Sequence, residues 1–256
     1  GCSEKENMKE LSTGTKVTSI EYITKDDRNW FEYFYYTNDG SLDEVQDSYS
    51  GLGRKYKIEY ENERIKEYST YEIDGNKLLF RDSIIYNLNG GIQAIYNFSI
   101  NPGEDLRLDG IDEYEYDNKN KVVKKSNYSV ASQKYYMIEK YYWSGDNIEK
   151  VQVYNGDEKR LYYEYFYKYD DKVNFKKNNP TKISNPINWS NNNVIEIDWN
   201  DYLGNIELPC RPCKIEYKYN LDNYPISVKY YWARLKLTYE WKLPDYNGRK
   251  TRVQPT

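Results

Sequence analysis

The most informative feature of this 256-residue sequence is a residue type that it lacks, because it contains no histidine. Histidine is the commonest general base, the commonest ligand of transition metals and the partner of many catalytic serines and cysteines. Its absence leaves carboxylates as the main candidates for acid–base catalysis. The sequence therefore favours a protein without enzymatic activity, metal or cofactor.

Alanine, long apolar runs and unbalanced charge are also scarce. The sequence has only three alanines, the residue type that favours helices most, and many tyrosines, isoleucines, threonines and valines, which favour strands. We therefore expect little helix. No apolar run approaches the roughly 20 residues that a membrane-spanning helix needs. The net charge of -4 comes from 37 basic and 41 acidic residues that are interspersed along the chain. Such a chain has no field that would attract nucleic acid, which is therefore not an expected partner.

Tyrosine is the residue type that the sequence has in abundance. The mean hydropathy of -1.03 is typical of disordered chains. However, 32 tyrosines, 6 tryptophans and 6 phenylalanines carry large apolar rings, whose contribution hydropathy scales undervalue for tyrosine. We therefore expect an ordered chain with an aromatic core.

Residues 161–169 show a design that recurs along the chain. Alternate positions place four tyrosines, from Tyr163 to Tyr169, on one face of a strand and place Glu164 and Lys168 on the other. We expect the tyrosine face to be buried and the charged face to meet water.

Aromatic strands alternate with polar turns at a spacing of about 24 to 30 residues, which indicates a repeat. The turns are rich in Asn, Asp and Gly, as in hairpins, and fall at 37–41, 61–63, 87–91, 117–120, 144–147 and 170–171. A degenerate hairpin is expected over 187–199. The pattern predicts a flexible tether at 1–16 and a single all-β repeat domain at 17–256. We expect one antiparallel meander of about 12 to 16 strands, curled into a barrel or half barrel.

The first residues, Gly1-Cys2 and a polar stretch after them, resemble a bacterial lipoprotein whose signal peptide has been removed, with Cys2 acylated. The alternative is an arbitrary start of the sequence. Glu4 and Glu6 also resemble the signal that sends lipoproteins of gut Bacteroidetes to the cell surface. The expected location is therefore the bacterial outer membrane, facing the periplasm or the exterior, with Cys2 as the sole membrane contact.

The Tyr-x-Tyr strands with Asp, Asn and Gly turns resemble the YD-type repeats of bacterial secreted proteins. Together with Gly1-Cys2, the chain resembles a Bacteroidetes lipoprotein family of unknown function with a porin-like fold. The resemblance covers about residues 17–243 and implies a porin-like antiparallel barrel or half barrel, with no catalytic residues. Because the face opposite the tyrosines carries Lys and Glu, and each Lys or Arg costs about 2 to 4 kcal/mol at mid-bilayer, we expect a soluble barrel.

Cys210 and Cys213 form a CxxC motif between prolines. Without histidine, a zinc site would need carboxylate ligands, so metal binding is not favoured. A local disulfide that closes a turn is the favoured interpretation in an oxidising compartment.

Tryptophans and paired carboxylates are the remaining candidate site residues. The rings singled out as platforms for glycan stacking are Trp30, Trp143, Trp189, Trp199 and Trp232, with packing in an aromatic core as the alternative. The carboxylates at 113–117 and 196–198 could serve a glycoside hydrolase, although alternating acidic residues are typical of a solvated face.

The sequence thus predicts a non-enzymatic, lipid-anchored envelope protein that offers a binding or scaffolding surface for glycans or an envelope protein. One alternative is a carrier that holds an apolar ligand in an aromatic-lined concavity. Another is a carboxylate-based glycoside hydrolase, which would need two carboxylates in a cleft and a raised pKa.

Overall fold

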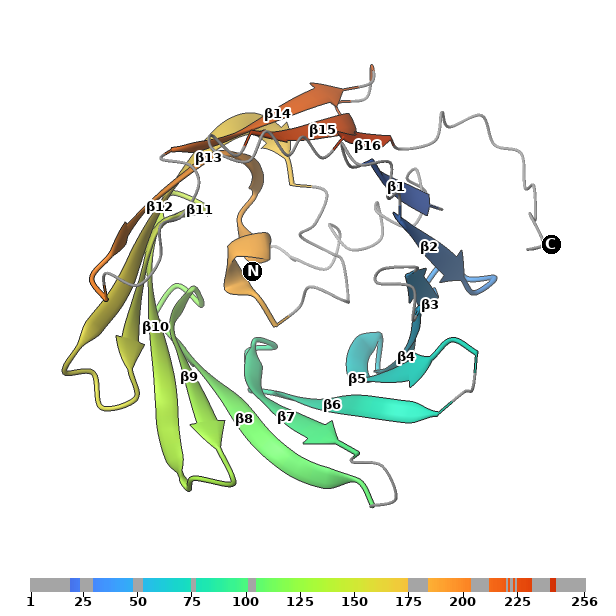
Figure 1. Cartoon of the computed structure of the whole chain (residues 1–256), viewed down its shortest axis with the longest axis horizontal. Helices are drawn as coiled ribbons and strands as arrows, with labels where there is room; N and C mark the ends of the chain where they lie inside the picture. Colours follow the sequence, from blue (N-terminus) through green and yellow to red (C-terminus); the bar gives the residue numbers. More distant parts are fainter. Residues whose placement is uncertain are drawn as a thin grey trace, which may run out of the picture.

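The computed structural model describes residues 19–23, 30–47, 53–74, 77–100, 105–174, 184–203, 212–219, 221, 223, 225–231 and 240–242. These residues form sixteen strands in one antiparallel sheet, which closes into the barrel of Figure 1. The strands follow one another around the barrel in sequence order, and β1 closes the ring by pairing with β16. The expected all-β meander is confirmed.

The elements have the following bounds. The strands are β1 (Ser19–Ile23), β2 (Trp30–Tyr36), β3 (Leu42–Asp47), β4 (Arg54–Glu61), β5 (Arg64–Glu72), β6 (Leu78–Tyr86), β7 (Ile92–Ser99), β8 (Arg107–Tyr116), β9 (Val122–Ser129), β10 (Lys134–Ser144), β11 (Asn147–Asn155), β12 (Leu161–Val173), β13 (Asn192–Asp201), β14 (Cys213–Tyr219), β15 (Pro225–Tyr231) and β16 (Glu240–Lys242). The 3-10 helix η4 (Pro186–Trp189) lies inside the ring of strands (Figure 1). In the described part of the chain, no helix has the length and apolarity needed to span a membrane.

The two faces of the sheet differ as the alternation of residues predicts. On β12, Tyr163, Tyr165 and Tyr167 pack against the hydrophobic core inside the barrel. Lys168 points outward, and 72% of its side chain is exposed. Glu164 also lies on the outward face, where it accepts a hydrogen bond from Gln152 Nε2 at 2.8 Å.

Ion pairs between neighbouring strands line the outer wall of the barrel. Lys124 Nζ lies 3.2 Å from Glu115 and 3.0 Å from Glu158, and Lys168 Nζ lies 2.7 Å from Glu196. The carboxylates that the sequence placed at 113–117 and 196–198 therefore include outer-wall residues that pair with lysines. Exposed pairs of this kind contribute about 0 to 1 kcal/mol each, so they favour a wall in water without adding much stability.

Five aromatic side chains make the same hydrogen bond, four of them at the ends of β4, β6, β8 and β10 and one within β12, and together they are named the strand-end ladder. Each donates to the backbone carbonyl of a residue 18 to 24 positions earlier, over 2.5 to 2.9 Å. The pairs are Tyr60 with Leu42, Tyr86 with Ile65, Tyr116 with Ile92, Trp143 with Val122, and Tyr169 with Ile148. Burial raises the pKa of Tyr116, which keeps its hydroxyl protonated as a donor. The ladder is how an aromatic core satisfies its polar atoms at this end of the barrel.

Two of the turns that follow ladder residues share one geometry. In the turns 87–91 and 117–121, the first backbone N–H donates to the carbonyl of the fifth residue, at 2.8 and 2.9 Å. Asn87 Oδ1 and Asp117 Oδ1 each accept two backbone N–H groups within the turn. The fourth positions, Gly90 and Asn120, have positive φ angles of 84° and 59°, which Gly and Asn tolerate best.

Two local expectations are wrong. Residues 170–171 form no turn, because β12 continues to Val173 and Asp170 accepts hydrogen bonds from the backbone of Asn193 and from the Tyr219 hydroxyl. Residues 187–189 belong to η4 and not to a strand. Pro186 begins η4, and the Asn185 side chain caps it by accepting the N–H of Ile187.

Tyr116→Phe tests the strand-end ladder. We expect it to lower the free energy of unfolding by about 1 to 2 kcal/mol, because the buried Ile92 carbonyl loses its donor. The control Tyr142→Phe removes an outer-wall hydroxyl and should change stability by less than about 0.5 kcal/mol. Urea denaturation of both variants gives the comparison, and equal midpoints would show that the ladder does not stabilise the fold.

Candidate functional site

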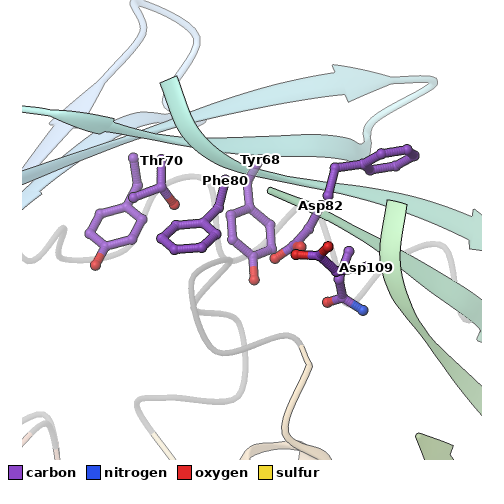
Figure 2. A pocket seen from close by; sticks show the side chains of 8 residues that line it. Tyr68, Thr70, Phe80, Asp82 and Asp109 are labelled. Carbon is purple, nitrogen blue, oxygen red and sulfur yellow. The ribbon is translucent and has the colours of Figure 1, made fainter. Parts of the chain in front are cut away.

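A cavity of about 310 Å³ opens on the inner wall of the barrel between β4 and β8. It is lined by Tyr56, Tyr68, Thr70, Phe80, Asp82, Asn97, Phe98 and Asp109, and it is named the inner pocket. Figure 2 shows the rings of Tyr68 and Phe80 and the carboxylates of Asp82 and Asp109 among the lining side chains. The pocket thus combines aromatic rings with two acidic groups.

The sheet register places most of these side chains on one face. Tyr56 pairs with Thr70, which pairs with Phe80 on the next strand. One step along, Tyr68 pairs with Asp82, which pairs with Asn97 on β7. Directly paired residues share a face of a sheet, so three neighbouring strands hold the aromatic and acidic groups together.

Asp109 reaches the pocket through a β-bulge. Asn97 pairs with Gly110 and Phe98 pairs with Leu108, so Asp109 has no partner in the strand ladder. Such an extra residue re-aims its side chain. The Asp109 carboxylate accepts a hydrogen bond from Ser99 Oγ and one from Arg107 Nε at 3.0 Å.

Asp82 is the most perturbed acidic group of the pocket. Burial raises the pKa of its carboxyl to about 6, and the Asp112 carboxylate adds to this effect. The Tyr68 hydroxyl donates a hydrogen bond to Asp82, which opposes the rise in pKa but does not cancel it. Near neutral pH the pocket therefore holds a half-buried carboxylate that is poorly compensated.

A second group of polar residues, the polar cluster, lies on the same wall over β8 to β10. Lys125 Nζ is 3.1 Å from Asp112 and 4.0 Å from Glu139, and 12% of its side chain is exposed. Asn127 donates to Asp112, and the Tyr141 hydroxyl donates to Glu139 at 2.7 Å. Buried charges of this kind are tolerated because they are paired and hydrogen-bonded. Lys125 is thus engaged by carboxylates other than Asp82.

The helix η4 packs beside the polar cluster and leaves the inner pocket open. The Tyr114 hydroxyl donates to the Ser184 carbonyl at 3.0 Å, and its ring lies 5.8 Å from that of Trp189. Asn174 Nδ2 ties the segment to the wall through the carbonyls of Asn188 and Ser190. Within the described part of the chain, η4 thus lies against the wall on the side of β8 and β11, and none of its residues lines the inner pocket on β4 to β8.

The tryptophans singled out in the sequence do not line the inner pocket where they are described. Trp143 belongs to the strand-end ladder, Trp189 lies in η4, and Trp199 is buried against Cys213 and Tyr165. Trp30 begins β2, but its side chain lies outside the described part of the structure, as does Trp232.

Of the three cysteines, the structure describes Cys213 alone. Cys213, the first residue of β14, is disulfide-bonded. Cys210, its expected partner, and Cys2, the expected acylated residue, lie outside the described residues.

The pocket residues were not predicted from the sequence, although one signal was present. Phe80, Asp82 and Ile84 alternate along β6, so an acidic residue interrupts an otherwise apolar face. The contribution of Asp109 could not be found in this way, because it depends on a bulge that pairing with β7 creates.

Asp82→Asn tests the electrostatics of the pocket. The folded protein holds the Asp82 proton up to about pH 6, whereas the unfolded chain loses it near pH 4, so this group lowers stability as pH rises through that interval. We expect the variant to exceed the wild type by about 2 kcal/mol in free energy of unfolding near pH 7.5, with the difference shrinking toward pH 4. Urea titrations across this pH range measure it. A difference that does not depend on pH would contradict the prediction.

No model of a known protein family matches the chain, and no curated protein matches it. Solved structures do match. A porin-like protein from Bacteroides uniformis has a TM-score of 0.55 at 10% identity, covering 90% of this chain and 98% of that chain. A porin-like protein from Bacteroides vulgatus has a TM-score of 0.56 at 12% identity, covering 92% of this chain and 100% of that chain. At these identities the likeness shows the fold alone, and the fold is porin-like.

Proposed function

We propose that the protein is a non-enzymatic binding protein of the bacterial envelope that holds a small polar ligand in the inner pocket. The observation that carries the proposal is Phe80, whose side chain faces the lumen beside Asp82 and is nevertheless 45% exposed. An apolar ring left open beside a half-buried carboxylate is a surface that a ligand would cover. The volume of about 310 Å³ lies at the lower end of the range of small-molecule sites.

The envelope location is supported by two observations of different kinds. Gly1-Cys2 and the polar stretch after it resemble a lipoprotein motif, and an acylated Cys2 would attach the barrel to the membrane. The solved structures of similar fold come from Bacteroides. Lysine–glutamate pairs on the outer wall suit a barrel that stands in water beside the membrane.

The pocket chemistry also ranks the two alternatives. A carrier of an apolar ligand is disfavoured, because Asp82 and Asp109 would be desolvated against hydrocarbon. A hydrolase is favoured by one observation, since a carboxyl with a raised pKa shares the pocket with a second carboxylate. The fate of the bound ligand separates hydrolysis from binding.

Phe80→Trp tests the pocket by filling it. Ile85→Trp on the same strand is the matched control, because Ile85 is 46% exposed and lies on the outer wall. Native mass spectrometry against monosaccharides, disaccharides, amino acids and small amines should find a ligand whose affinity falls at least about tenfold in Phe80→Trp and is unchanged in Ile85→Trp.

Two results would overturn the binding proposal. One is that no compound loses affinity in Phe80→Trp. The other is that a bound compound is released in cleaved form by the wild type, which would establish the hydrolase instead.

The second candidate function, glycan binding, is favoured by a patch on the outer wall. The exposed rings of Tyr142, Phe166 and Tyr202 surround a hydrogen-bonded pair, Gln152 and Glu164. The hydroxyls of Tyr142 and Tyr202 bond to Gln152 and Glu164, so the rings are held in place. Fixed rings beside amide and carboxylate groups can stack on a sugar and bond to its hydroxyls.

Tyr202→Ala tests the outer-wall patch. Tyr202 is 51% exposed, so its removal should leave stability nearly unchanged. A glycan array should show signals that fall about threefold to tenfold in Tyr202→Ala and persist in Phe80→Trp, as expected for one aromatic contact. Signals that persist in Tyr202→Ala would exclude this patch.

A further inference from the structure

The lining of the inner pocket is acidic and aromatic. Among the described residues that line it there are two carboxylates, Asp82 and Asp109, and no lysine or arginine. The rings of Tyr56, Tyr68 and Phe80 come from three neighbouring strands on the same face of the sheet. An anionic ligand would meet two carboxylates there, so the charge of the lining selects against it.

Among the residues that the structure describes, no lysine or arginine pairs with Asp82. The charged and polar groups that act on it are the Tyr68 hydroxyl and the Asp112 carboxylate. The buried cation of the same wall, Lys125, is held by Asp112 at 3.1 Å and by Glu139 at 4.0 Å. A positive charge brought into the pocket would therefore be the first ion pair of Asp82.

Asp109 is paired only at the surface. Its partner Arg107 is 3.0 Å away, and the two side chains are 57% and 43% exposed. An exposed pair of this kind contributes about 0 to 1 kcal/mol, so it weakly competes with a ligand for the carboxylate.

The aromatic rings add a second attraction for positive charge. The face of an aromatic ring attracts ammonium groups within about 6 Å, most strongly where water is excluded. Phe80 presents an open ring next to that of Tyr68, beside the two carboxylates (Figure 2). Rings and carboxylates together attract an organic ammonium ion more selectively than either does alone.

From this lining we infer that the ligand of the inner pocket is a small organic cation, an ammonium group attached to a compact body. The inference rests on the proposed function and specifies its ligand class. The cation would sit between the ring of Phe80 and the carboxylates of Asp82 and Asp109, with Asn97 and Thr70 available to bond a hydroxyl of the ligand. A cavity of about 310 Å³ suits an amino alcohol or amino acid amide and not a folded peptide.

The test compares a cation with a neutral molecule of the same shape. Choline and 3,3-dimethylbutan-1-ol differ in that a carbon replaces the charged nitrogen. Isothermal titration at about pH 7.5 should show choline binding to the full chain at least about tenfold more tightly than the alcohol. Asp82→Asn should remove most of this preference and leave the affinity for the alcohol unchanged, and Ile85→Trp should leave both affinities unchanged.

The outcomes separate this inference from the proposed function. If sugars or neutral molecules bind and lose affinity in Phe80→Trp while choline has no advantage over the alcohol, the pocket is a binding site but the cationic ligand is wrong. If neither charged nor neutral compounds lose affinity in Phe80→Trp, both proposals fail. An advantage of choline that persists in Asp82→Asn would also overturn the inference, because the charge would then be recognised elsewhere.

Discussion

Every tyrosine that is buried brings a hydroxyl that needs a hydrogen-bond partner, and the rest of this structure depends on how that need is met. At one end of the barrel the partner is a backbone carbonyl in an earlier hairpin, as for Tyr86 with Ile65 and Tyr116 with Ile92. Each bond contributes on the order of 1 kcal/mol net, but a shift of register would leave both donor and acceptor buried and unpaired. The strand-end ladder therefore specifies the register of the sheet more than it adds stability.

Buried polar groups on the inner wall also need hydrogen-bond or ionic partners. Two regions of this wall, the polar cluster and the inner pocket, differ in whether their carboxylates have a cationic partner. In the polar cluster, Lys125 forms ion pairs with both Asp112 and Glu139, and Asn127 and Tyr141 donate hydrogen bonds to the same two carboxylates. In the inner pocket, the described partner of Asp82 is the Tyr68 hydroxyl, and no described lysine or arginine pairs with it. A region whose charges are satisfied internally is structural, whereas a buried carboxylate without a counter-charge is a place where a ligand can gain free energy.

Alternation of residues was sufficient to predict the strands, their antiparallel order and the buried face of Tyr163, Tyr165 and Tyr167, because these depend on local periodicity. The prediction from alternation was wrong where a side chain bonds to a distant strand. Asp170 has the residue type of a turn, but in the fold it accepts hydrogen bonds from Asn193 and Tyr219 on β13 and β14. Closure of the barrel and the position of Asp109 depend on pairing between strands, which one sequence does not reveal. Asp82 was visible in principle as an acidic residue on an apolar face.

Each hydrogen bond of the strand-end ladder joins one hairpin to the hairpin before it. These bonds therefore do not depend on how many strands the barrel contains. A duplicated or deleted hairpin would find the same acceptor on its neighbour, and the ring would gain or lose two strands at an unchanged junction. The diameter of a barrel grows with the number of its strands. Tandem duplication within the gene thus offers a route by which this architecture can change the width of its lumen, and with it the size of the molecules that fit, while the joint between units stays the same.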